Sequence, residues 1–344
     1  MKISKEKLAL IVAYVVALIM AFFVGGIIIL LFTGKDPISI YRGFFLNSFF
    51  SSYGILELAS KAVPIIIAGS GMLIAFRSGL WNLGAEGQMA IGAIISTALG
   101  IYVHLPGIIL IPLIFVASFI GGGLWSGISG YLKNKFGVSI MLTTLMMNYI
   151  ALKLMEYMLS GPMTMRNQPY PRTAEIISQA RLPFLKYPLN STFIIALLII
   201  PIVWFILNRT TIGYRLQAVG LNREAARFAG MKIQNLTMIV MILSGGISAL
   251  GGTAEIIGDF FCMQRNVTGG YGFIAIVVLM LARENIIALP FAAFFISGIT
   301  VGATSLPMVG VPSIFSQILI GLLIIAGVLA DYIERRLKLL WEVS

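Results

Sequence analysis

The sequence predicts an all-α fold, a polytopic bundle of about ten transmembrane helices. Hydrophobic residues make up 59% of the 344 residues and charged residues only 11%. A folded domain in water could not cover so much apolar surface. Several apolar runs reach the roughly 20 residues that one helix needs to cross the bilayer core. These runs are continuous, whereas the strands of a membrane barrel alternate apolar and polar residues.

The first predicted span is an apolar run from about Leu8 to Phe32, which follows Lys2, Lys5 and Lys7. This run is too long for a signal-peptide core and lacks a small-residue cleavage pattern, so we expect an uncleaved helix.

The next segment, residues 38–58, mixes phenylalanines with polar residues such as Arg42 and Glu57. This mixture predicts an amphipathic helix at the membrane surface. Apolar runs then predict nine further spans. Their approximate limits are 62–76, 80–102, 106–132, 138–160, 192–208, 234–258, 271–282, 286–306 and 313–331.

Basic residues orient the predicted bundle. With both termini in the cytoplasm, 15 of the 24 Lys and Arg residues lie on that side, as the positive-inside rule requires. They are Lys2, Lys5, Lys7, Arg77, Lys133, Lys135, Arg209, Arg215, Arg223, Arg227, Lys232, Arg283, Arg335, Arg336 and Lys338. The chain 1–344 is then one transmembrane domain, with a cytoplasmic loop at 209–233 and an external loop at 161–190. The external loop carries basic residues too, but long loops follow the charge rule less strictly.

Two predicted spans, 62–76 and 271–282, are short. Each lies beside a glycine-containing polar segment, GLWNLGAEGQ (79–88) and NVTGGYG (266–272). Interrupted helices at matching places in two halves of a chain are typical of transporters with an internal repeat, whose interface holds the substrate path. We therefore predict an internal repeat. The alternative is ordinary glycine between packed membrane helices.

Polar residues in the first of these segments are candidates for the substrate path. Asn82, Glu86 and Gln88 are flanked by apolar residues, and a carboxylate in hydrocarbon must face a cavity, a partner or the headgroups. The alternative is a cytoplasmic turn in which Glu86 is solvated and pairs with Arg77.

A second candidate set, Thr144, Asn148 and Tyr149, interrupts the apolar span 138–160. Thr144 and Asn148 are four residues apart and share one helix face. That face either contacts the substrate or forms a hydrogen-bonded contact between helices.

Two charged pairs have simpler interpretations. Lys153 and Glu156, three residues apart, are expected to form an ion pair near the outer membrane surface. Glu255 and Asp259 are expected at an external helix end, where they are either solvated or meet basic residues of a docking protein.

Composition argues against several other functions. The one cysteine, Cys262, excludes an intrachain disulfide framework, and the one histidine, His104, excludes a zinc site of the HExxH type. We therefore expect no metal site and no catalytic residue. Basic cytoplasmic loops and anionic lipid account for the net charge of +11, so we assign no nucleic-acid role.

The segment TIGYRLQAVGLNREAARFAGMKIQN (211–235) is a polar, basic island in an apolar chain. Asn222 is a favourable N-cap, Glu224 complements the positive end of a helix dipole, and Gly230 favours a helix end. Two alanines between them give a small, flat face. The pattern predicts a short, rigid docking helix, with a solvated loop as the alternative. The expected docking residues are Asn222, Arg223, Glu224, Ala225, Ala226 and Gly230.

These motifs resemble a known family. Glu224-Ala225-Ala226 followed by Gly230 resembles the EAA-x-x-x-G head of the loop by which ABC importer permeases dock on their ATPase subunit. Beyond it the sequence reads VMIL (240–243) and lacks the proline of the older I-x-L-P pattern. We therefore assign docking to the helix rather than to Glu224 alone.

Four longer segments resemble the permease subunits of nucleoside and simple-sugar importers, which are related to ribose and branched-chain amino-acid permeases. They are FRSGLWNLGAEGQMAIGA (76–93), GVSIMLTTLMMNYIA (137–151), TTIGYRLQAVGLNREAARFAGM (210–231) and GGISALGGTAE (245–255). The GLWNLGAEGQ and MMNYIA forms are most similar to the nucleoside type.

This resemblance implies a multi-pass permease subunit of the cell membrane that moves nucleosides by alternating access. It implies no cofactor on this chain, and ATP used by a separate ATP-binding subunit, because a GxxxxGK[ST] sequence is absent. The other implied partners are a second, homologous permease subunit, an extracytoplasmic substrate-binding protein and membrane lipid. Three alternatives stay open: a simple-sugar (ribose-like) importer permease, a secondary transporter with its ion site at Glu86 or Glu255, and a polytopic enzyme.

Overall fold

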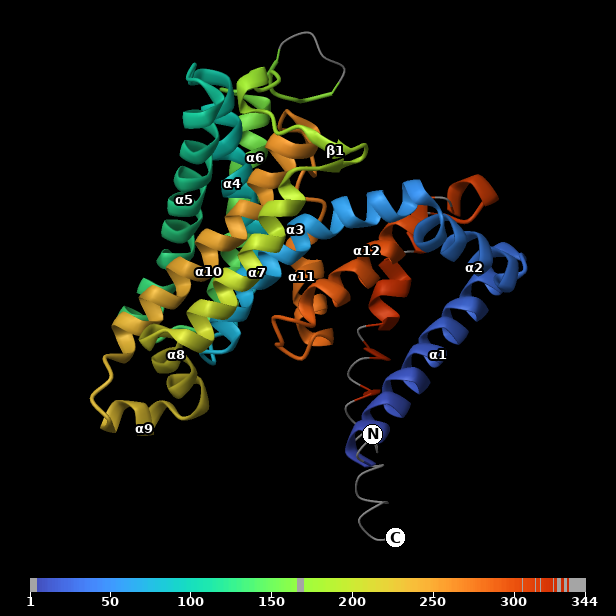
Figure 1. Cartoon of the computed structure of the whole chain (residues 1–344), viewed down its shortest axis with the longest axis horizontal. Coiled ribbons are helices and arrows are strands. Elements are labelled where there is room, and N and C mark those ends of the chain that lie inside the picture. The colour runs from blue at the N-terminus through green and yellow to red at the C-terminus, as the bar shows by residue number, and fades with distance from the viewer. Residues whose placement is uncertain are drawn as a thin grey trace. The chain divides into compact units, whose positions relative to one another are not determined.

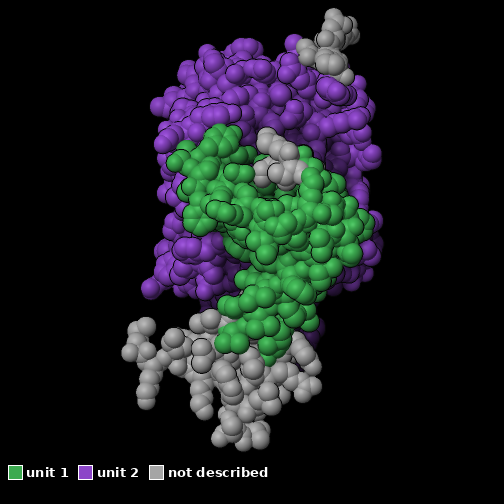
Figure 2. All heavy atoms as spheres, turned by 90° about the vertical axis from the view of Figure 1, so that its right-hand side faces the viewer, with its two compact units in different colours: residues 1–58, 294–344 green, residues 59–293 purple. Residues whose placement is uncertain are grey.

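A computed structural model of the chain describes residues 5–165, 170–304, 306–312, 314–315, 317–323, 325–326, 329–330 and 333. Contacts divide the chain into two compact units, coloured separately in Figure 2. Unit 1 comprises residues 1–58 and 294–344, and unit 2 comprises residues 59–293. The single transmembrane domain expected from the sequence stays a prediction.

Helices dominate the described residues (Figure 1). The α-helices are α1 (Lys5–Thr33), α2 (Pro37–Phe45), α3 (Ser52–Phe76), α4 (Ala85–Tyr102), α5 (Gly107–Phe136), α6 (Ile140–Ser160), α7 (Thr192–Arg209), α8 (Thr211–Leu221), α9 (Arg223–Phe228), α10 (Ile233–Glu255), α11 (Tyr271–Leu281) and α12 (Leu289–Thr304). Two π-helical turns, Leu46–Phe50 and Ile256–Phe260, follow α2 and α10. These elements support an all-α membrane bundle.

In unit 1, local signals in the sequence start α2. The Asp36 carboxylate accepts hydrogen bonds from the backbone N–H groups of Ile38 and Ser39 at 3.1 and 3.0 Å, which satisfies donors that lack a partner in the first helical turn. The Tyr41 hydroxyl of α2 donates to the Phe22 carbonyl oxygen of α1 at 2.8 Å. This bond ties the two helices together.

In unit 2, α4, α5 and α10 pack side by side along much of their length (Figure 1). Glycines allow the close approach. A Cβ added to Gly92 of α4 would collide with the Ala249 carbonyl oxygen of α10, and a Cβ added to Gly122 of α5 would collide with the Ala249 side chain. Membrane helices commonly pack through small residues. In lipid the hydrophobic effect does not drive helices together, so close backbone packing supplies van der Waals contact instead.

Five helical stretches are long and apolar enough to cross a membrane: Val15–Thr33, Ser52–Phe76, Gly107–Phe136, Thr192–Arg209 and Ile233–Phe260. The count of ten spans and the cytoplasmic position of both termini stay predictions. Lys2 at one end and Arg335, Arg336 and Lys338 at the other, which helped to set that orientation, lie outside the described residues.

Three predicted limits are wrong. The short span 62–76 is the second part of α3, a helix of 25 residues. The surface helix expected at 38–58 is broken into α2, a π-helical turn and the start of α3. The span expected from residue 80 begins at Ala85, because the chain turns at Gly79, whose φ of +70° lies in the left-handed region that glycine adopts at low cost.

The loop 161–190, which the sequence predicts to be external, contains a feature that an all-α prediction omits. Strands β1 (Phe184–Lys186) and β2 (Leu189–Asn190) form a small antiparallel hairpin. The loop also pairs with two helical elements: the Ile177 N–H donates to the Gly100 carbonyl oxygen of α4 at 2.9 Å, and the Leu182 N–H donates to the Ile257 carbonyl oxygen at 2.8 Å. These bonds hold the loop against the ends of α4 and α10.

Candidate functional site

The polar segment before α4 forms a buried hydrogen-bonded network. Asn82 and Gln88 bond reciprocally through their amides, at 3.3 and 3.1 Å. The Asn82 amide also donates to the Ser244 hydroxyl of α10 at 2.8 Å and accepts from the Gly84 N–H at 2.9 Å. Both amides are therefore committed to partners inside the protein, where they fix the turn that precedes α4.

Helix α6 supplies the second half of this network. The Asn148 side chain accepts from the Gly87 N–H and donates to the Leu83 carbonyl oxygen, both at 2.8 Å. The Thr144 hydroxyl oxygen accepts from the Leu83 N–H at 3.1 Å. The first turn of a helix has N–H groups without partners inside the helix. Asn148 of α6 therefore caps the N-terminus of α4 by accepting from the Gly87 N–H. The shared face of Thr144 and Asn148 is thus a hydrogen-bonded contact between helices.

Tyr149 does not join this network. It lies on another face of α6, and 63% of its surface is exposed. The candidate set on α6 therefore combined residues from two faces of that helix. Four of the six candidate path residues share one network, namely Asn82, Gln88, Thr144 and Asn148, and Tyr149 lies outside it.

Glu86 links the start of α4 to the start of α11. The Thr268 hydroxyl donates to one carboxylate oxygen at 2.5 Å, and the Gly272 N–H donates to the other at 2.8 Å. A carboxylate is stabilised at the positive end of a helix dipole, and here it meets the N-terminal turns of two helices. A Cβ at Gly272 would collide with the Glu86 backbone nitrogen, so only glycine permits this approach.

The contact joins the two glycine-containing segments that the sequence singled out, 79–88 and 266–272, within unit 2. The alternative of a solvated Glu86 paired with Arg77 is wrong. Glu86 is buried, and the Arg77 guanidinium instead donates to the Glu284 carbonyl oxygen at 2.7 and 3.1 Å. Thr268 had no distinctive local pattern and was missed, although its segment was recognised.

A second charged group lies where α3 meets the end of α10. Lys61 forms an ion pair with Asp259 at 3.1 Å, and Glu255 is buried beside them, with 4% of its surface exposed. The solvated helix end expected for Glu255 is wrong, because α3 brings Lys61 against it. Lys61 was missed, although a lone lysine in an apolar run is a usable signal. The expected Lys153–Glu156 pair is confirmed at 2.8 Å.

The basic segment 209–233 folds into two short helices, α8 and α9. The Asn222 side chain accepts from the Ala225 N–H at 3.0 Å, which confirms the predicted N-cap. Gly230 has a φ of +81°, and the Met231 N–H reaches the Ala226 carbonyl oxygen at 3.1 Å. Together with the Gly230 N–H bond to the Arg227 carbonyl oxygen, this is the Schellman arrangement that ends helices. Helix α9 is therefore fixed at both ends.

One side of α9 faces the protein and the other is open. Ala226 is buried, whereas Arg223, Glu224 and Ala225 are exposed. Two apolar side chains on this segment are almost fully exposed, Leu221 at 89% and Phe228 at 91%. Exposed apolar side chains on a polar segment are typical of a surface that a partner covers.

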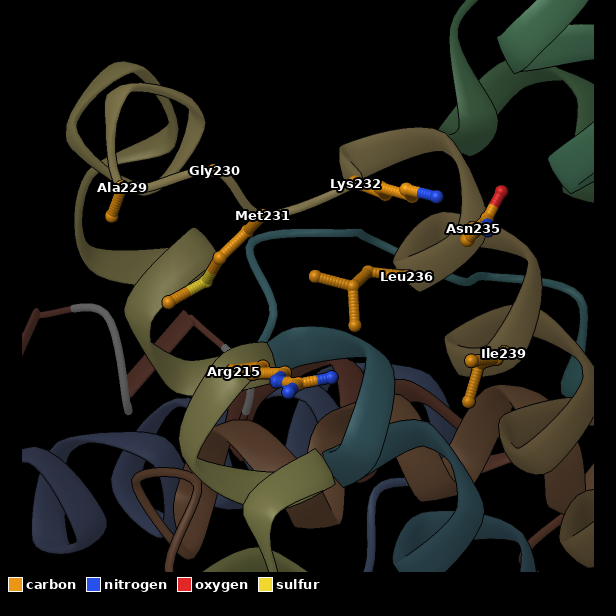
Figure 3. A pocket seen from close by; sticks show the side chains of 8 residues that line it. All are labelled: Arg215, Ala229, Gly230, Met231, Lys232, Asn235, Leu236 and Ile239. Carbon is orange, nitrogen blue, oxygen red and sulfur yellow. The ribbon is translucent and has the colours of Figure 1, made fainter.

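A pocket of about 440 Å³ lies between α8, the turn 229–232 that follows α9, and α10 (Figure 3). Figure 3 shows Arg215 on α8, Gly230 and Met231 after α9, and Leu236 and Ile239 on α10 around it. Apolar and cationic side chains line this pocket together.

Comparison with known proteins agrees with this arrangement. Residues 54–328 match the family described as branched-chain amino acid transport system / permease component. The glucose ABC transporter permease protein TsgB13 of Haloferax volcanii is 32% identical over 93% of this chain and 88% of its own. The guanosine ABC transporter permease protein NupP of Bacillus subtilis is 34% identical over 87% and 88%. The nucleoside ABC transporter permease protein NupB of Lactococcus lactis is 29% identical over 86% and 85%.

The matched residues include the polar segment before α4, the α6 face, α9 and α11. The chain is a multi-pass membrane permease subunit of an ABC importer, related to nucleoside and sugar permeases. It belongs to the branched-chain amino acid transport system / permease component family.

Proposed function

We propose that this chain forms the translocation path for nucleosides in an ATP-driven importer of the cell membrane. The observation that carries the substrate class is the similarity to NupP and NupB, which are named for guanosine and nucleosides and match along most of the chain. Simple sugars are the second candidate, because TsgB13, named for glucose, is about equally similar.

The energy comes from an ATP-binding partner that docks on α9. A short helix held by Asn222 at its start and Gly230 at its end transmits a push without bending. Its exposed side, with Ala225 and Phe228, fits a groove in a partner subunit, together with the exposed Leu221 at the end of α8. The pocket behind α9 leaves room for the helix to move relative to α10 as the partner closes.

Three further partners complete the proposal. A second, homologous permease subunit forms the other side of the path, an extracytoplasmic binding protein delivers the substrate, and lipid covers the apolar helices. The resemblance of segments 76–93, 137–151, 210–231 and 245–255 to importer permeases supports this assembly.

Within this proposal the buried network has a supporting role. Asn82, Gln88, Thr144 and Asn148 hold the chain turn before α4, and Glu86 holds α11 to it. They shape the wall of the path, since their polar atoms already have partners inside the chain.

Purification of the chain from its native membrane in mild detergent tests the proposal. An ATPase should co-purify, and its activity should rise with a nucleoside and the recovered binding protein, but not with leucine. Stimulation by glucose or ribose alone would establish the sugar alternative. A chain that purifies alone and takes up solute on an ion gradient would contradict ATP-driven import.

Two variants test docking on α9. Ala225→Arg places a long cation on the exposed face, and Gly230→Trp puts a bulky side chain where φ is +81°. Both should reach the membrane and recover at least tenfold less ATPase, on the order expected when one interface anchor is lost.

Gly137→Trp is the matched control. Gly137 ends α5 with a φ of +71° and open space around it, so the backbone strain is similar while α9 is unchanged. Normal ATPase recovery with both α9 variants would remove the docking assignment.

A further inference from the structure

The charged group at the end of α10 differs from every part of the network around Glu86. Glu255 is buried, yet its Oε2 atom has no hydrogen-bond partner among the residues that the structure describes. A buried polar atom without a partner is rare, because it loses its bonds to water and gains nothing in return. In a membrane protein such a group marks a ligand or ion path.

The surroundings of Glu255 combine donors and acceptors. The charges of Lys61 and Asp259 act on Glu255, and the Tyr271 hydroxyl interacts with Glu255, Lys61 and Asp259. Lys61 binds Asp259 at 3.1 Å and lies 5.6 Å from the centre of the Phe260 ring. An ammonium group has three N–H donors, so the bonds of Lys61 to Asp259 and to the Tyr271 hydroxyl leave one donor available.

The group is also reachable. The Lys61 and Asp259 side chains are 25% and 28% exposed, whereas Glu255 is buried. Asp259 and Phe260 sit on a π-helical turn, which ends at Phe261 with a φ of +56°. π-Helical turns re-aim side chains and are frequent at functional sites, and a non-glycine residue in the left-handed region indicates a constraint imposed by the surrounding structure.

We infer that Lys61, Glu255, Asp259 and Phe260 bind the vicinal hydroxyl groups of a neutral solute, such as the ribose of a nucleoside. A hydroxyl both donates and accepts, so it matches the two carboxylates and the ammonium together. A cation would use only the carboxylates and would face Lys61, while an anion would use only Lys61 and would face the carboxylates. The Phe260 ring supplies an apolar surface for the C–H face of the sugar.

This inference rests on the proposed function, and the test separates the two. The complete importer in proteoliposomes takes up guanosine or 2′,3′-dideoxyguanosine, which lacks both ribose hydroxyls. Uptake efficiency (kcat/KM) is compared between the wild type and the variants Glu255→Gln and Asp259→Asn. The same binding protein serves all variants, so its own selectivity cancels in each ratio of variant to wild type.

Glu255→Gln should lower the uptake efficiency for guanosine about tenfold, at the upper end of what one lost hydrogen bond produces. It should lower the uptake efficiency for the dideoxy analogue by less than about twofold, because the analogue lacks the hydroxyl groups that this bond needs. Asp259→Asn is the second variant, for the case that Glu255→Gln lowers the amount of assembled importer. Asp259 is more exposed, and its replacement should also reduce guanosine uptake more than uptake of the dideoxy analogue. Glu156→Gln, in the exposed Lys153–Glu156 pair, is the matched control and should change neither uptake.

Equal loss for both solutes, or no loss for either, would overturn the hydroxyl site and leave the proposed function intact. A wild-type importer that takes up neither nucleosides nor sugars would overturn the proposed function, and with it the site.

Discussion

The buried polar regions around Glu86 and around Glu255, both in unit 2, differ in how completely their groups are bonded. Around Glu86, the side chains of α4 and α6 and the start of α11 satisfy one another with short hydrogen bonds. Around Glu255, one carboxylate oxygen has no hydrogen-bond partner within the described part of the chain, and the neighbouring ion pair of Lys61 and Asp259 is partly exposed. Burial alone therefore does not identify a binding site in this protein.

This difference in bonding indicates a different role for each region. Satisfied groups already have the bonds that a solute would offer, so displacing them gains little. An unsatisfied group gains a bond when a solute arrives. The region around Glu86 is accordingly a framework, and the region around Glu255 is the place to test for solute binding.

The largest expected effect breaks the framework at its closest contact. Gly272→Val would force a side chain into the backbone nitrogen of Glu86, and overpacking of a tight contact costs roughly 1–3 kcal/mol or more. We expect at least about a tenfold loss of folded chain, measured as the monodisperse fraction after detergent extraction. Gly43→Val is the control, because Gly43 on α2 has open space around it. Normal recovery of Gly272→Val would show that α11 is free to move away from α4.

A smaller effect separates two neighbouring residues of α6. Asn148→Leu leaves the Gly87 N–H and the Leu83 carbonyl oxygen without their partner, and each unpaired buried group costs about 1–3 kcal/mol. Tyr149→Leu, on the exposed face, should cost less than about 0.5 kcal/mol. The free energy of unfolding in mixed micelles measures both. Similar losses for the two variants would remove the cap that α6 provides.

The smallest effect compares the two glutamates directly. Glu86→Gln replaces an acceptor of two hydrogen bonds with a group whose amide nitrogen cannot accept, and should cost about 1–2 kcal/mol of unfolding free energy. Glu255→Gln replaces a buried oxygen that has no hydrogen-bond partner among the described residues, so it should cost less unfolding free energy than Glu86→Gln.

The same unfolding measurement checks this pair. A larger loss for Glu255→Gln than for Glu86→Gln would reverse the assignment of framework and binding region.

Sequence reasoning succeeded where structure is local. Helices α1, α5 and α10 are continuous apolar runs, and α9 carries its own start and stop signals in Asn222 and Gly230. The start of α3 at Ser52 was missed, because the polar residues before it resemble a surface segment and a π-helical turn intervenes.

The sequence did not predict which side chains pair, because the partners lie far apart along the chain. The partners of Glu86 lie 182 and 186 residues further along the chain, and Lys61 lies 198 residues from Asp259. No local pattern records such pairs. Polarity singled out Asn148 and Glu86 correctly as unusual residues, but only the fold distinguishes a satisfied group from an unsatisfied one.

The most direct test of ATP-driven import uses the purified importer in proteoliposomes, with labelled guanosine and the binding protein outside and ATP inside. We expect accumulation that requires hydrolysable ATP, persists when ion gradients are collapsed, and is lost with Ala225→Arg. Accumulation that follows an ion gradient and proceeds without ATP would contradict ATP-driven import.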